Sequence, residues 1–140
     1  LVIAGADGWG DIDVPHTANV QFIGYVDDQH LGAVYARASV MCYPSLWEGF
    51  GLPILEAMAQ GTPVVTSIGT STQEVAGGAA ILVDPLSEES IRNGIDEALR
   101  DADALKQRGR VRASQTTWQK TAVATALIYD EVVNDEVTSS

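Results

Sequence analysis

The sequence predicts an α/β domain built on a parallel sheet, and three observations support this class. Short apolar runs recur along the chain, at residues 1–5, 20–25, 38–45, 62–67 and 79–84. Each run is apolar almost throughout, which is typical of strands buried on both faces of a parallel sheet. Helix-like stretches separate the runs, and alternating strands and helices indicate a doubly wound, Rossmann-like arrangement.

The helices expected between these strands lie at 28–37, at 52–60 and, as a short one, at 73–77. Pro53 stands just inside the second helix, where its missing N–H has no helical partner to lose and its fixed φ favours the helical backbone. The glycines of the preceding stretch EGFG allow the chain to turn sharply into that helix.

After Pro85 the pattern is helical to the end of the chain. Ser87 is the expected N-cap of a helix whose apolar side chains fall on one face, namely Ile91, Ile95, Ala98 and Leu99. Further helices are expected at about 103–113 and at 116–133, and we expect Trp118 to pack the last one onto the sheet. The length suits one domain, over residues 1–134, followed by a flexible tail at 135–140.

The composition excludes several classes of function. A net charge of −11 argues against a nucleic-acid partner, because phosphate contacts need clustered Lys and Arg. No apolar run approaches the roughly 20 residues of a membrane span, and no basic segment of a signal peptide precedes LVIAG. Cys42 is the only cysteine and is expected in the core. Arg37 is the only Lys or Arg before Arg92, so a phosphate bound in that part of the chain would rely mostly on backbone amides, or on groups that this chain does not supply.

The stretch EGFGLPILE, residues 48–56, carries the strongest chemical signal. It follows a predicted strand and opens a predicted helix, so its free amides and positive dipole end form a potential anion site. Glu56 lies about one turn inside the helix, where a carboxylate can accept two hydrogen bonds from a vicinal diol. Glu48 precedes the turn and could do likewise for a hexose. From spacing alone, an exposed glutamate on a surface helix remains an equal alternative.

The longer stretch PSLWEGFGLPILEAMAQGTPVVTS, with EVAG at 74–77 and AAILVDP after it, resembles the C-terminal, donor-binding domain of retaining glycosyltransferases of family four, which have the GT-B fold. The spacing of Glu48 and Glu56 is that family's E-x7-E motif. FIGYVDDQHLGAVYARASVMCYPS is similar to the family's preceding segment. The similarity runs from about Leu1 to Tyr129 and is nearest to bacterial mannosyl- and rhamnosyl-type transferases of polysaccharide assembly.

The resemblance implies a role for each matched residue. Glu56 would bind the ribose hydroxyls of a nucleotide-sugar donor, and Tyr25 and Val26 would line the nucleobase site. Glu48 would lie against the donor sugar as the candidate catalytic residue. The turn beside it would contact the sugar and the diphosphate through Gly49, Phe50, Gly51 and Leu52. No metal and no cofactor is implied, because the nucleoside diphosphate sugar is a substrate.

The resemblance also implies parts that these residues do not supply. The family's first strand and loop, with an Arg and a Lys that contact the diphosphate, would precede Leu1, as would the acceptor-binding N-terminal domain. The expected partners are therefore the donor and that N-terminal domain of the same parent chain. The expected location is cytoplasmic, with peripheral attachment to the inner membrane through the other domain left open.

Some features point to other chemistry only superficially. Asp11-Ile12-Asp13 reads as a D-x-D metal motif without the architecture that uses it, and GADGWG at 5–10 lacks the spacing of a dinucleotide loop. His16 and His30 are isolated and expected at the surface. Trp47 could touch the donor or serve in packing.

The sequence thus predicts the donor-binding domain of a hexosyltransferase that acts on a hydroxyl acceptor and is inactive as this piece alone. Two alternatives stay open: a sugar-nucleotide epimerase of the same fold, and a non-catalytic nucleotide-binding or interaction module.

Overall fold

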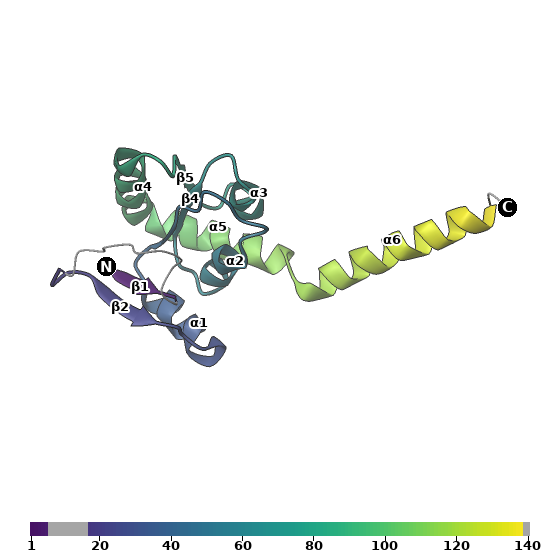
Figure 1. Ribbon diagram of the computed structural model, residues 1–140, viewed down its shortest axis with the longest axis horizontal. Coiled ribbons are helices and arrows are strands. Elements are labelled where there is room, and N and C mark those ends of the chain that lie inside the picture. Colours follow the sequence, from purple (N-terminus) through teal and green to yellow (C-terminus); the bar gives the residue numbers. More distant parts are fainter. Residues whose placement is uncertain (6–16, 139–140) are drawn as a thin grey trace.

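The computed structural model describes residues 1–5 and 17–138, the last four of these by their backbone alone. The described strands pair in parallel and form two sheets (Figure 1). In the first sheet β1 (Val2–Ala4) pairs with β2 (Gln21–Gly24). In the second, the order is β3 (Met41–Tyr43), β4 (Val64–Ser67) and β5 (Ile81–Val83). The predicted α/β class with parallel strands is confirmed.

The strands divide into two sheets along the chain, the first formed by β1 and β2 and the second by β3, β4 and β5 in that order. Among the described residues, no strand pairs with both β1 and β3.

Burial differs between the two sheets. All four residues of β4 are buried, as expected of an apolar strand with neighbours on both edges and helices on both faces. The residues of β1 and β2 are mostly exposed, and Phe22 is 41% exposed. The prediction that every apolar run is buried on both faces is therefore wrong for β1 and β2. The reason is that these two strands pack chiefly on each other.

Helices cover both faces of the β3–β5 sheet (Figure 1). On one face, α2 (Leu52–Ala59) and α3 (Ser71–Ala76) form a core with β4 that includes Ile54, Met58, Val64, Val75 and Ala76. On the other face, α4 (Glu88–Arg100) contributes Ala98 to a cluster with Val65, Val83 and Leu105. A Cβ at Gly94 would lie 2.4 Å from Cγ1 of Val83, so glycine is needed for α4 to lie this close to the sheet.

Capping side chains begin two helices where the sequence predicts them. The first, α1 (Asp28–Arg37), begins after Asp27, whose side chain accepts hydrogen bonds from the backbone N–H groups of Gln29 and His30. The N-cap of α4 is Ser87, which accepts from the Ser90 N–H at 3.2 Å. Both capping side chains satisfy first-turn amides that have no partner within the helix.

The last two helices are longer than predicted. The fifth, α5 (Ala102–Gln115), packs on α2, and α6 (Trp118–Thr138) then extends away from the sheets (Figure 1). Trp118 is 75% exposed, so the prediction that it packs α6 onto the sheet is wrong. Residues 135–138 of the expected tail continue α6. Within the described residues, none of the helices has the length and apolar character to cross a membrane.

Candidate functional site

The candidate site is the turn between β3 and α2. Gly51, the N-cap of α2, is buried and has a φ of +99°, a conformation that side chains with a Cβ rarely adopt. A Cβ there would also lie 3.0 Å from Cγ2 of Thr72 on α3. No side chain caps α2, and Pro53 stands in its first turn. Pro53 has no N–H, and the Ile54 N–H donates to the Gly51 carbonyl at 3.0 Å, so the Leu52 N–H is the first-turn amide that remains available to an anion.

Hydroxyl groups from β4 and α3 hold this turn in place. The Oγ1 of Thr66 donates to the Tyr43 carbonyl at 3.0 Å, and the Oγ of Ser67 donates to the Ser45 carbonyl at 2.7 Å. The Oγ of Ser71, in the first turn of α3, donates to the Glu48 carbonyl at 2.7 Å. Thr66 and Ser67 are fully buried, so the backbone before Glu48 is fixed from inside the core.

Each glutamate of the E-x7-E motif accepts a hydrogen bond from a tyrosine. The Tyr43 hydroxyl, at the end of β3, donates to Oε1 of Glu48. The Tyr35 hydroxyl, on α1, donates to Oε2 of Glu56 at 3.2 Å. In the described part of the chain, the other carboxylate oxygen of each glutamate has no hydrogen-bond partner. One oxygen of each carboxylate is thus positioned by the protein and the second is left for a ligand.

The tyrosines are held in their protonated, donating form. Burial raises the pKa of Tyr35 to about 12, and the charge and hydrogen bond of Glu56 act in the same direction. Burial also raises the pKa of Tyr43, with the hydrogen bond to Glu48 as a further cause. Both tyrosines pack against the core cluster that includes Ile54 and Met58 of α2.

The structure gathers most of the predicted site residues on one segment. Gly49, Phe50 and Leu52 are exposed on the turn, and Glu56 follows on the exposed side of α2. Tyr25, which is 78% exposed, and Val26 lie in the loop from β2 to α1. Among the described residues, no hydrogen bond joins that loop to the Glu48 turn.

Trp47, next to Glu48, is 93% exposed and so has no packing role within the described part of the chain. Of its two predicted roles, contact with a ligand is the one that remains available. Cys42, expected in the core, is half-buried and packs against the cluster around Val65.

Sequence reasoning missed the residues that support the glutamates, above all Tyr35 and Tyr43. Tyr43 lies in the predicted strand at 38–45 and ends β3, just before the turn, so its place in the chain could have suggested a role. The pairing of Tyr35 with Glu56 joins two helices and had no sequence signal. The stretch SIGTST at 67–72 begins at the end of the predicted strand 62–67, and its hydroxyls were the available hint for Ser67 and Ser71.

Metal ligation has no geometric support in the described residues, where no three His, Cys, Asp or Glu side chains lie close enough to share an ion. His30 is an exposed residue whose Nδ1 lies 2.8 Å from Oδ2 of Asp27. The motif at Asp11 and Asp13, the rest of the GADGWG stretch and His16 lie outside the described residues.

A parallel α/β domain with a glycine turn, an uncapped helix start and two carboxylates at the carboxyl end of its strands belongs to the class of Rossmann-like proteins, in which ligands bind at that edge of the sheet. The comparison with protein families identifies the family within that class. The model of the family described as Glycosyl transferases group 1 matches residues 14–115. The chain belongs to this family.

Among curated proteins, the chain is similar to the O-antigen chain mannosyltransferase B of Escherichia coli, with 38% identity over 92% of this chain and 36% of that protein. Among solved structures, it is similar to the sucrose-phosphate synthase of Thermosynechococcus elongatus, with a TM-score of 0.74 and 31% identity over 83% of this chain. It is also similar to Anabaena HepE in complex with UDP and glucose, with a TM-score of 0.69 and 25% identity over 80% of this chain. The match covers 31% and 32% of those two chains, so the sequence spans about a third of the proteins that it resembles.

Proposed function

We propose that this chain is the donor-binding part of a retaining glycosyltransferase, which transfers a hexose from a nucleoside diphosphate sugar to a hydroxyl group of an acceptor. One observation carries the proposal. In a chain that belongs to Glycosyl transferases group 1, Glu48 and Glu56 flank the Gly51 turn, and each keeps one carboxylate oxygen for a ligand. The mannosyltransferase relative favours mannose, or a related hexose such as rhamnose, as the transferred sugar.

In this proposal, the diphosphate binds the Leu52 N–H at the start of α2 and the backbone of the turn before it. Gly49 and Gly51 allow the backbone to approach the phosphate oxygens closely. Backbone donors are needed because Arg37 is the only basic residue before Arg92. Glu56 accepts hydrogen bonds from the ribose 2′- and 3′-hydroxyls, while Tyr35 fixes the orientation of its carboxylate.

Glu48 acts at the other end of the donor. As the bond between the anomeric carbon and the phosphate oxygen breaks, positive charge develops on the sugar ring and negative charge on the leaving phosphate. The Glu48 carboxylate, oriented by Tyr43, stabilises the positive charge. The acceptor hydroxyl attacks on the face from which the phosphate leaves and gives its proton to a phosphate oxygen. The configuration is retained, and no protein base, metal or cofactor takes part.

The remaining parts of the reaction are assigned to a longer parent protein. An acceptor-binding domain and cations for the diphosphate would lie outside the residues considered, in line with the third of each similar protein that this chain spans. We therefore expect residues 1–140 alone to bind nucleoside diphosphate weakly and to transfer no sugar, and turnover by this piece would contradict the assignment. The proposal includes a cytoplasmic location, which accords with a single cysteine and no disulfide.

A calorimetric titration of the longer parent enzyme with a panel of nucleoside diphosphates tests the role of Glu56 in binding. Glu56→Ala should weaken the affinity roughly ten- to a hundredfold, the range for hydrogen bonds to a charged group. Glu89→Ala is the matched control, because Glu89 is an exposed glutamate in the first turn of α4. Equal affinities of wild type and Glu56→Ala would show that Glu56 is an exposed glutamate with no part in binding, and would refute the proposed site.

A further inference from the structure

A second hollow lies at the opposite end of α3 from the Glu48 turn. It has a volume of about 420 Å³ and lies between α5 and the glycine pair that follows α3. Ser71, at the start of α3, contacts the Glu48 carbonyl, whereas Gly77 and Gly78, just beyond its end, line the hollow. Ala79, also in its wall, precedes β5, so the hollow is at the amino end of that strand. It is separate from the proposed donor site.

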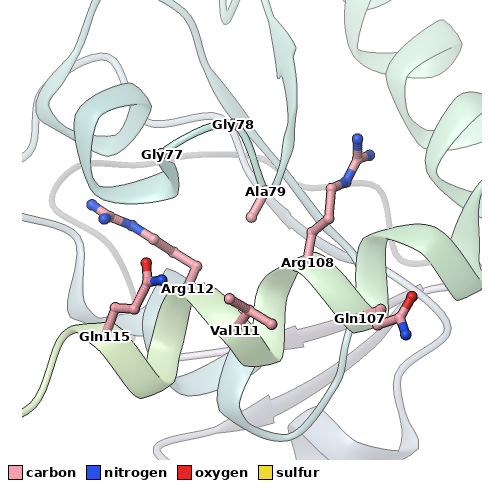
Figure 2. A pocket seen from close by; sticks show the side chains of 8 residues that line it. All are labelled: Gly77, Gly78, Ala79, Gln107, Arg108, Val111, Arg112 and Gln115. Atoms are coloured by element: carbon pink, nitrogen blue, oxygen red, sulfur yellow. The ribbon is translucent and has the colours of Figure 1, made fainter.

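Two arginines of α5 face this hollow. Figure 2 shows Arg108 and Arg112 rising from the helix, with Val111 between them and Ala79 above. The two are one helical turn apart, where like charges repel each other. In a chain with a net charge of −11, two neighbouring cations that share one cavity are an unusual concentration of positive charge.

The two arginines differ in what they already contact. Arg112 donates from Nε to the Val75 carbonyl at 2.8 Å and from a terminal nitrogen to the Glu74 carbonyl at 3.0 Å. These bonds satisfy carbonyl groups at the end of α3 and hold Arg112 in place. Arg108 is exposed, and no hydrogen bond or ion pair joins it to any residue that the structure describes.

The glycine pair adds a backbone donor to the same wall. Gly77 and Gly78 have φ values of +55° and +79°. A Cβ at Gly77 would lie 2.7 Å from Nε of Arg112, so glycine is required for the arginine to reach the end of α3. The N–H groups of Gly77 and Ala79 are bonded within the turn. The Gly78 N–H donates to no described group, which leaves it available at the hollow.

We propose that this hollow binds a small organic anion, with a phosphate or carboxylate group between Arg108 and Arg112 and an apolar portion on Val111. Guanidinium groups form strong charge-assisted hydrogen bonds to such oxyanions, and the Gly78 N–H supplies a further donor. The volume is in the range of small-molecule sites, and larger than a bare inorganic ion needs. The exposed side chain of Val111 provides the apolar contact.

The test is an amide NMR titration of the 140-residue chain with three probes: phenyl phosphate, benzoate and inorganic phosphate. We expect saturable shifts at Gly78 and Ala79 with phenyl phosphate or benzoate, and the stronger of the two identifies the anionic group. Inorganic phosphate should bind more weakly, because it makes no contact with Val111. Binding of inorganic phosphate as tight as that of phenyl phosphate would overturn the assignment of an organic ligand.

Arg108→Gln removes the unpartnered cation, and Lys106→Gln on the same helix is the control with the same change in charge. Arg108→Gln should weaken probe binding roughly ten- to a hundredfold, while Lys106→Gln should leave it unchanged. Both side chains are exposed, so neither change should alter folding. The proposal is overturned by the absence of saturable shifts at Gly78, by equal losses in the two variants, or by shifts confined to Gly51 and Leu52.

Discussion

The two glycines of the EGFG turn should respond very differently to alanine. Gly51 has a φ of +99° and a virtual Cβ 3.0 Å from Cγ2 of Thr72. The left-handed backbone costs a residue with a Cβ about 1–2 kcal/mol, and overpacking at a buried contact costs about 1–3 kcal/mol. Gly51→Ala should therefore lower the free energy of unfolding by about 2–5 kcal/mol. Gly49 has no positive φ and no neighbour within 4 Å of a virtual Cβ, so Gly49→Ala should change the free energy of unfolding by less than about 0.5 kcal/mol.

Urea denaturation followed by far-ultraviolet circular dichroism measures this difference. The expected loss in Gly51→Ala lowers the midpoint by about 1–2 M urea. Thr72→Ser removes the methyl group that meets the new Cβ but keeps the hydroxyl, which lies 2.6 Å from Oγ1 of Thr70. In the Gly51→Ala background, Thr72→Ser should restore part of the lost stability, while the backbone cost remains. Equal midpoints for the Gly49 and Gly51 variants would refute the reasoning that only Gly51 must be glycine.

Three further predictions concern the tyrosines, Glu48 and the smaller sheet. The pKa of Tyr35 is about 12 in the folded chain, above its ordinary 10.0, so its contribution to stability is complete below about pH 10 and is lost as the pH rises toward 12. Between pH 10 and 12, the free energy of unfolding measured by denaturation should fall more steeply in wild type than in Tyr35→Phe. Tyr25→Phe, a change at an exposed tyrosine, should behave as wild type. In the longer enzyme, Glu48→Gln should lower kcat by about a hundredfold, with little change in KM and no change in the affinity for the bare nucleoside diphosphate. A raised KM with an unchanged kcat would show that Glu48 only binds sugar hydroxyls. Backbone amides of β1 and β2 should exchange with deuterium faster than those of the buried β4, and equal protection would contradict the exposure of the smaller sheet.

Local signals made the helices predictable. The bounds of α1 agree with the predicted 28–37, because Asp27 is a strong N-cap that acts on the next residues of the chain. Ser87 was identified as the N-cap of α4 for the same reason. The start of α2 at Leu52 could be read from the glycine turn and Pro53, which determine the backbone locally.

The burial of each strand and the packing of the last helix were less predictable, because both depend on residues far away in the sequence. The apolar runs of β1 and β4 look alike, but β4 is covered on both faces and β1 is not, because coverage depends on which strands and helices pack on each. Trp118 was expected on the sheet and lies on an extended helix instead, since the direction in which α6 leaves α5 is not encoded in its own periodicity.

For the candidate site, the sequence pointed to Glu48, Glu56 and the turn between them, through their spacing and the family resemblance. It did not reveal the side chains that support them. The tyrosines that orient the two carboxylates come from α1 and β3, and the Tyr35–Glu56 pair spans 21 residues. Contacts of this kind arise from the packing of elements, so they became visible only in the folded chain.

The most direct test of the proposed donor site is an amide NMR titration of the 140-residue chain with nucleoside diphosphates, because this method detects weak binding and locates it. The account predicts saturable shifts of the Gly49, Gly51 and Leu52 amides, with smaller shifts at the same concentration in Glu56→Ala. Shifts elsewhere that leave the start of α2 unchanged, or shifts of equal size in Glu56→Ala, would contradict the claim that the two glutamates and the glycine turn form a nucleotide-sugar site.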